Sequence, residues 1–437
     1  MFETIVALAT PPLKSALAVI RLSGDDCFSI VNKVFDKDLL KNKTRGIHYG
    51  HIVDDDKVID EVVLLTYVAP NSFTGEDSIE IMCHGSMLIA NQIINLFLRS
   101  GARMAVNGEF SSRAFLNNKI DLVQAEAIND LINSTTEEAK ELSMLALEGK
   151  TSSIFRPLKS HLGEMLAKIE VNIDYPEYED IEEVSREYLL ENSKYLIDEI
   201  NKLINQGEKN RLYHDGLNLV IVGKPNVGKS SLFNALLKED KAIVTNIAGT
   251  TRDIVEGEIN LFGIPTKIYD TAGIHESKDV IESIGINKAL SIIEKADLVI
   301  YLLDESNEDL ELYNSIKDKK HIIVHNKADL VKEKNKDYVY ISALNNDIDP
   351  LLNKIKEVLD IDDLAIVPSL NNQRQLGLLR KMVTDLTRAV KDLNDNQPID
   401  LISVSLLAAY NSAIDLLGEG NKNDLSDEIF SRFCVGK

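Results

Sequence analysis

The sequence of 437 residues has few cysteines and no long apolar run. Its three cysteines, Cys27, Cys83 and Cys434, are widely spaced and form no Cys-x-x-Cys pair. This pattern argues for a reducing cytosol and against a zinc module. No run of about 18 apolar residues is present, and no basic segment precedes the short apolar run near the N-terminus. We therefore expect a cytoplasmic protein with no membrane span and no signal peptide.

Basic residues are also scarce. Lys and Arg number 48 against 70 Asp and Glu, which gives a formal net charge of -22. This charge disfavours a broad nucleic-acid surface, because phosphates would be repelled. A local basic patch could still hold a structured RNA, so an RNA partner stays open. The acidic stretch 177–183 is typical of a solvated loop, with a metal site as the alternative.

A phosphate-binding loop is the most informative motif. Residues 223–230 read Gly-Lys-Pro-Asn-Val-Gly-Lys-Ser, between a strand-like run at 217–222 and a helix-forming run at 231–237. The glycines let backbone N–H groups point at phosphate oxygens, helped by the positive end of the following helix. Lys229 would reach the β- and γ-phosphates, and the Ser230 hydroxyl would bind Mg²⁺. The alternative is a glycine-rich turn without a ligand, and the motifs that follow make it less favoured.

Three further motifs follow strand-like segments in the order that a guanine-nucleotide switch requires. Asp270-Thr271-Ala272-Gly273 is suited to hold Mg²⁺ through water and to sense the γ-phosphate. In Asn326-Lys327-Ala328-Asp329 the last carboxylate can accept two hydrogen bonds from guanine, which adenine cannot offer. Ser342-Ala343 suits the contact to the guanine oxygen. We predict that GTP binds to Asn226, Val227, Gly228, Lys229, Ser230, Ser231, Thr245, Asn246, Ile247, Ala248, Gly249, Thr250, Thr251, Asp270, Thr271, Ala272, Gly273, Asn326, Lys327, Asp329, Ser342 and Ala343.

The residues that would activate hydrolysis are unusual. Ile274 stands where many GTPases have a water-orienting glutamine. Arg252 could act as an arginine finger or be a surface residue. Asn226, with carbonyls of the segment 245–253, could bind a monovalent cation beside the phosphates, with Thr251 on Mg²⁺. From the residues alone, Asn226 is equally well explained as a turn residue after proline.

The chain is long enough for several domains, and its pattern of strand-like and helical segments changes along its length. Residues 1–118 mix short strand-like runs with one clear helix, as in an α+β domain. Residues 119–212 and 369–437 are helical, and residues 213–368 alternate strand and helix. The two helical parts could be a linker and a tail. We prefer a single helical domain into which an α/β P-loop (Ras-like) G domain is inserted.

Over essentially its whole length the chain resembles the tRNA-modification GTPase family MnmE, also called TrmE. The strings that carry this resemblance are far more specific than the GTPase motifs: 4–7, 9–12, 70–77, 108–110, 113–117, 119–122, 124–127 and 433–437, the last reading Phe-Cys-Val-Gly-Lys. The resemblance implies a folate-binding-like N-terminal domain that forms a homodimer and holds 5,10-methylene- or 5-formyl-tetrahydrofolate. It also implies a heterotetramer with an FAD-containing MnmG-type protein.

The resemblance further implies that the two proteins install an aminomethyl or carboxymethylaminomethyl group on the wobble uridine of tRNA. Hydrolysis would be activated when G domains pair in the presence of K⁺. By position, Arg21, Glu80, Lys119 and Lys437 match the folate contacts. Asn226, Thr245, Ile247 and Thr250 match the K⁺ ligands, and Ser230 and Thr251 match the Mg²⁺ ligands. Glu282 matches the glutamate that orients the catalytic water and would act with Lys229.

The chain departs from the family pattern at two places. Residues 13–16 replace a glycine- and arginine-rich stretch, and Ser86 replaces the second glycine of a His-Gly-Gly motif. Both changes bear on the folate pocket. Cys434 matches a family cysteine whose role we leave open. A ribosome-assembly GTPase without one-carbon chemistry is the alternative function, but such proteins usually append a basic RNA-binding domain, and none is visible.

Overall fold

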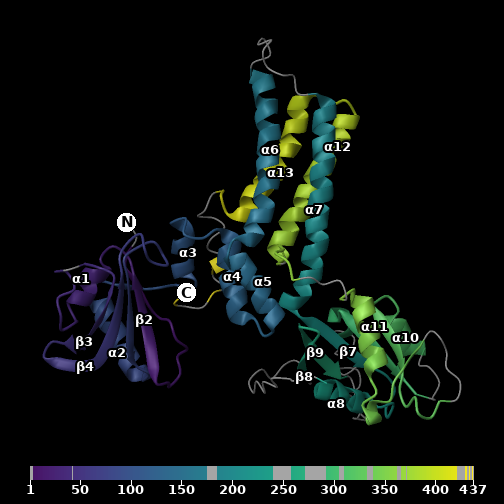
Figure 1. Ribbon diagram of the computed structural model, residues 1–437, viewed down its shortest axis with the longest axis horizontal. Helices are drawn as coiled ribbons and strands as arrows, with labels where there is room; N and C mark the ends of the chain where they lie inside the picture. The colour runs from purple at the N-terminus through teal and green to yellow at the C-terminus, as the bar shows by residue number, and fades with distance from the viewer. Residues whose placement is uncertain are drawn as a thin grey trace, which may run out of the picture. The chain divides into compact units, whose positions relative to one another are not determined.

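The computed structural model describes residues 3–41, 43–174, 185–239, 257–270, 292–304, 310–331, 338–361, 366–370, 372–420, 429–430, 433 and 436. They form two compact units (Figure 1). The first unit contains residues 1–129, 147–164 and 407–437, and the second contains 130–146 and 165–406. The boundaries of the four predicted segments stay a prediction.

The first unit is built on a six-stranded sheet. Its strands are β1 (Ile5–Leu8), β2 (Leu17–Ser23), β3 (Gly46–Asp54), β4 (Lys57–Tyr67), β5 (Ser78–His84) and β6 (Arg103–Met104). They lie in the order β3-β4-β5-β2-β1-β6, with every neighbouring pair antiparallel except β1 and β6. Apolar side chains alternate along these strands, so one face is buried against α1 (Cys27–Asn32) and α2 (Met87–Ser100).

The C-terminal residues complete the core of the first unit. Helix α3 (Glu109–Leu116) follows the sheet, and α4 (Leu122–Asn133) begins six residues later. Phe115 and Leu122 from these helices form a buried cluster with Phe430 and Phe433. The ring centroids of Phe115 and Phe430 are 6.2 Å apart. Residues more than 300 positions apart therefore share one core.

Further helices come before and after the second sheet in the sequence. They are α5 (Glu137–Leu147), α6 (Lys150–Asp174), α7 (Arg186–Asp215), α12 (Gln373–Asn394) and α13 (Ile399–Leu417). Helices α7 and α12 run antiparallel (Figure 1). Asn210 Nδ2 donates to Ser369 Oγ at 2.9 Å, and Arg186 Nη2 donates to the Gln397 carbonyl at 2.6 Å. The chain thus leaves α7 and returns into α12 at the same end of the pair, as an inserted domain requires.

The inserted part is an α/β domain. Apolar side chains of its sheet and helices form a core on each face of the sheet. Strands β7 (Leu217–Val222), β8 (Gly257–Leu261), β9 (Ile264–Asp270), β10 (Leu298–Leu303), β11 (His321–His325) and β12 (Val339–Tyr340) lie in the order β12-β11-β10-β7-β9-β8. All pairs are parallel except β8 with β9. Helices α8 (Lys229–Glu239), α10 (Leu310–Ile316) and α11 (Asp349–Leu359) accompany them. Every residue of β10 is buried, as expected of a central parallel strand.

Among the described helices, α13 is the one whose length and composition would also suit a membrane span. Its Ile402, Leu406 and Ala409 are fully buried inside the protein. Core helices of many proteins meet the same criteria, so α13 is weak evidence for a span.

Candidate nucleotide and folate sites

The phosphate loop has the backbone shape that its glycines predict. It connects β7 to α8, and both Asn226 and Gly228 have positive φ angles, 65° and 100°. A Cβ atom on Gly228 would lie 2.2 Å from Asn326 Nδ2, and one on Gly223 would lie 2.3 Å from the Leu302 carbonyl oxygen. Both positions therefore need glycine, for a close approach of the backbone and, at Gly228, for the left-handed conformation. The turn fits a bound phosphate chain.

Lys229 stands at the first position of α8 with its side chain largely buried. Its Nζ donates to the carbonyls of Gly223 and Lys224, at 2.9 Å each. These bonds hold the ammonium inside the loop, where it would meet phosphate oxygens. Ser230 follows in the first turn and is exposed, so its hydroxyl is accessible to Mg²⁺.

One buried asparagine joins the phosphate loop to the base-recognition motifs. Asn326 Nδ2 donates to the Val227 carbonyl at 2.9 Å, and Asn326 Oδ1 accepts from the Ala343 N–H at 3.1 Å. The neighbouring Lys327 pairs with Asp304 at 2.7 Å and donates to the Asn226 carbonyl at 3.3 Å. These contacts hold four separate segments of the sequence together.

Asp329, the residue predicted to read guanine, is held by a serine of the next motif. It is exposed, and its Oδ1 accepts a hydrogen bond of 2.9 Å from Ser342 Oγ. Ser342 and Ala343 are themselves buried at the start of a short 3₁₀ turn, Ala343–Asn345. The hydroxyl orients the carboxylate, so its hydrogen-bonding edge has a defined direction.

Several predicted residues lie outside the described part of the chain. The backbone of Asp270 ends β9 beside Ile221, but its side chain is not among the described atoms. The other members of this group are Thr245, Asn246, Ile247, Ala248, Gly249, Thr250, Thr251, Arg252, Thr271, Ala272, Gly273, Ile274, Glu282, Cys434 and Lys437, together with the acidic stretch 177–183. Their roles stay predictions.

Two of the predicted folate contacts pair with each other. Arg21 on β2 lies opposite Glu80 on β5, and Arg21 Nη2 is 2.7 Å from Glu80 Oε1. Arg21 Nη1 also donates to the Gly436 carbonyl at 3.1 Å. The guanidinium carbon lies 6.0 Å from the centre of the Phe73 ring, and Phe73 is 43% exposed. A carboxylate, a guanidinium and an accessible ring are the groups that a pterin with an acidic tail needs.

Lys119 contacts the loop that carries Phe73. Its Nζ donates to the Pro70 carbonyl at 2.9 Å, and its stem packs on Gly75, which has a φ of 80°. Nearby, Asn117 Nδ2 donates to the Thr74 carbonyl at 2.7 Å. The described members of the predicted folate contacts, Arg21, Glu80 and Lys119, therefore lie at one loop and its adjoining strands. Their chemistry fits a tetrahydrofolate.

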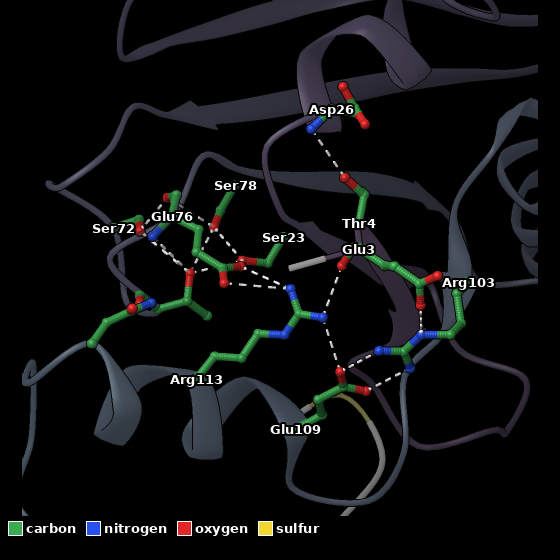
Figure 2. Close-up of polar contacts among 12 residues, drawn as sticks. Glu3, Thr4, Ser23, Asp26, Ser72, Glu76, Ser78, Arg103, Glu109 and Arg113 are labelled. Carbon is green, nitrogen blue, oxygen red and sulfur yellow. Dashed lines mark hydrogen bonds and ion pairs between the residues drawn. The ribbon is translucent and has the colours of Figure 1, made fainter. Parts of the chain in front are cut away.

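A buried ion network behind this loop was not predicted. In Figure 2, Arg113 on α3 reaches Glu76, with 3.1 Å between Nη1 and Oε2, and Ser23 Oγ donates to the same carboxylate at 2.7 Å. Arg113 Nη2 is 2.9 Å from Glu109 Oε1. Burial alone would raise the pKa of Glu109, but hydrogen bonds from Arg103, the Val106 N–H and Arg113 outweigh it and lower that pKa. The network fixes loop 70–77 against α3.

Comparisons with known proteins cover the whole chain. A family model described as the MnmE helical domain matches residues 122–434, and one described as the GTP-binding protein TrmE N-terminus matches residues 4–119. The tRNA modification GTPase MnmE of Ureaplasma parvum serovar 3 is 43% identical, and that of Malacoplasma penetrans is 45% identical; each match covers 100% of both chains. This chain belongs to the MnmE family.

Membership in the MnmE family confirms the predicted enzyme class, a GTP hydrolase of tRNA modification. It also confirms the fold class with its N-terminal, helical and inserted G domains. A crystal structure of Aquifex aeolicus Era bound to GDP and AlF₄⁻ is 29% identical over 39% of this chain and 66% of that one, with a TM-score of 0.27. That score is too low to support an argument beyond the family matches.

Proposed function

We propose that the chain is a potassium-activated GTPase that acts with an FAD-containing partner on the wobble uridine of tRNA. The product is 5-carboxymethylaminomethyl- or aminomethyluridine. The observation that carries this proposal is the N-terminal cluster of Arg21, Glu80 and Phe73, in a chain matched from end to end by MnmE relatives. A ribosome-assembly switch would have no use for such a cluster.

The proposed cation requirement rests on the phosphate loop. Asn226 has a positive φ and is exposed, and its carbonyl is held by Lys327. Asn226 lies in the phosphate loop, and its side-chain amide would share a K⁺ with Thr245, Ile247 and Thr250, where the ion would offset developing charge on the phosphates. Ser230 and Thr251 would hold Mg²⁺, and Glu282 would orient the water.

Turnover in KCl and in NaCl at equal ionic strength tests the cation site, because general screening is then the same. Glu282→Ala should retain GTP binding and lose about 10²–10⁴-fold in hydrolysis. Glu294→Ala, at an exposed position before β10, is the matched control and should hydrolyse normally. Equal rates in both salts would reject the K⁺ site, and an active Glu282→Ala would reject the role of that glutamate.

The N-terminal sheet is proposed to form the homodimer and to bind 5,10-methylene- or 5-formyl-tetrahydrofolate, with Lys119 and Lys437 on the acidic tail. The FAD-containing partner completes a heterotetramer, and the complex works in the cytoplasm. When bound, tetrahydrofolate would supply the one-carbon unit. The folate part of the proposal is supported by the described residues near Phe73. They place cations, a carboxylate and an aromatic ring on one loop and two strands.

Profiling the nucleosides of bulk tRNA tests the whole proposal. A strain lacking this protein should lose the modified wobble uridine, and the intact gene should restore it. A gene carrying Arg21→Ala should restore it poorly. An unchanged wobble-uridine profile in the deletion strain would favour the ribosome-assembly alternative.

A further inference from the structure

A histidine and a buried aspartate form a tightly defined pair at the end of β5. His84 Nδ1 lies 2.8 Å from Asp60 Oδ1, and the backbone N–H of His84 donates to Asp60 Oδ2 at 2.8 Å. The Asp60 side chain is 8% exposed, whereas the His84 side chain is 61% exposed. One buried carboxylate therefore fixes both the main chain and the ring of an otherwise accessible histidine.

This arrangement settles which ring nitrogen is available. A carboxylate only accepts hydrogen bonds, so Nδ1 carries a hydrogen and Nε2 remains as the outward-facing nitrogen. A base oriented by a buried acid is the relation found in proton-transferring dyads. The adjacent Cys83 takes no part, because burial and then the charge of Asp60 raise its pKa to about 11. The pair is thus a proton-handling group and not a cysteine–histidine nucleophile.

The position of His84 relates it to the proposed folate cluster. Residues 80, 82 and 84 share one face of β5 by strand alternation, and Glu80 and His84 are about 13 Å apart along the strand. A pterin ring with its bridging amine has a length of that order. The turn after His84 is also fixed: a Cβ on Gly85 would lie 2.2 Å from the Ser15 carbonyl oxygen. By strand alternation, the side chain of His84 therefore leaves β5 on the same side as that of Glu80.

We propose that His84 is a catalytic residue of the N-terminal domain that transfers a proton between its Nε2 and a nitrogen of the bound one-carbon carrier. This proposal rests on the tetrahydrofolate site proposed above. Asp60 holds the ring and stabilises the charge on the imidazole while the proton is on it. The proton comes from water and returns to water, because the His84 side chain is largely exposed, so the step needs no further reactant.

A purely structural role is the competing explanation, and one substitution separates the two. His84→Asn keeps an N–H donor near the place of Nδ1, so it can retain the bond to Asp60 while lacking Nε2. His51 on β3 offers a matched control, because its Nδ1 lies 2.8 Å from Asp36 Oδ2. Carbethoxylation by diethyl pyrocarbonate, read by mass spectrometry, should modify both histidines, and 5-formyltetrahydrofolate should protect His84 and not His51.

Turnover then tests the proton transfer in the full chain with its partner and tRNA. His84→Asn should bind 5-formyltetrahydrofolate as the parent does and lose about 10²–10⁴-fold in wobble-uridine formation. Imidazole added to His84→Ala should restore part of the rate, which a structural role would not allow. If His84→Asn binds the folate and turns over at the full rate, the role of His84 is refuted and the folate site is not. Failure of the parent chain to bind the folate would refute the site itself.

Discussion

His214 offers a sharp test of how the end of α7 is held where the chain enters the inserted domain. It lies in the last turn of α7, next to the entry into β7. Its Nε2 is 2.8 Å from Asp130 Oδ1 on α4, and its Nδ1 is 2.8 Å from Asp215 Oδ1. Hydrogen bonds to Asp130 and Asp215 raise the pKa of His214 from 6.5 to about 10. The imidazolium thus joins two helices just before the phosphate-loop strand.

The size and sign of its contribution follow from this pKa. At about 1.36 kcal/mol per unit, the shift sets an upper limit of about 5 kcal/mol. Asp215 is 35% exposed, so screening by solvent reduces the contribution to about 2–3 kcal/mol. The pKa is higher in the folded than in the unfolded protein. The stabilisation is therefore complete below pH 6.5 and is lost as the pH rises toward 10.

Calorimetry on His214→Ala and the parent chain measures this contribution. We expect the transition of the second unit to shift down by about 5–10 °C near pH 6, with a much smaller shift near pH 9.5. His51→Ala, which breaks a histidine–aspartate pair of the first unit, should leave that transition unchanged. A difference that is constant across the pH range, or absent at pH 6, would refute the assignment to the charged imidazole.

Three other predictions concern the ligand sites. Asp329→Asn should exchange guanine preference for xanthine, because the amide presents one donor and one acceptor; GTP still outcompeting XTP would contradict this. Gly228→Ala should weaken nucleotide binding by about 1–3 kcal/mol, from left-handed strain and a clash with Asn326; Gly377→Ala, where an added Cβ meets nothing, is the control in a titration with labelled GDP. Arg21→Ala should cost about 1.5–3 kcal/mol in calorimetric binding of 5-formyltetrahydrofolate, and undiminished affinity would count against the site.

The motifs of the predicted nucleotide site could be recognised in the sequence for a physical reason. Each motif is a short contiguous string at the end of an apolar strand, and parallel strands bring their carboxyl ends to one edge of the sheet. The phosphate loop, Asn326 and Asp329 could therefore be assigned before their contacts were known. The double hydrogen bond of Asn326 to Val227 and Ala343 was not predicted, because it depends on the approach of three loops.

The N-terminal domain was less predictable from residues alone. Arg113 and Glu76 are 37 positions apart, and their pairing depends on the docking of α3 on the loop after β4. Local periodicity carries no information on such a contact. The pairing of Arg21 with Glu80 likewise needs the register of β2 with β5. The sequence assigned both residues to folate only through the family resemblance, with the cation on the acidic tail and the carboxylate on the pterin.

The aromatic cluster that joins the two ends of the chain has a consequence for synthesis on the ribosome. Phe115 and Leu122 are made about 300 residues before their partners Phe430 and Phe433. At 5–20 residues per second, about 300 residues take roughly 15–60 s to translate. For that time the nascent N-terminal domain exposes an apolar patch and lacks the Gly436 carbonyl that accepts from Arg21. The Arg21 contact of the proposed folate site therefore forms only after residue 436 has been made.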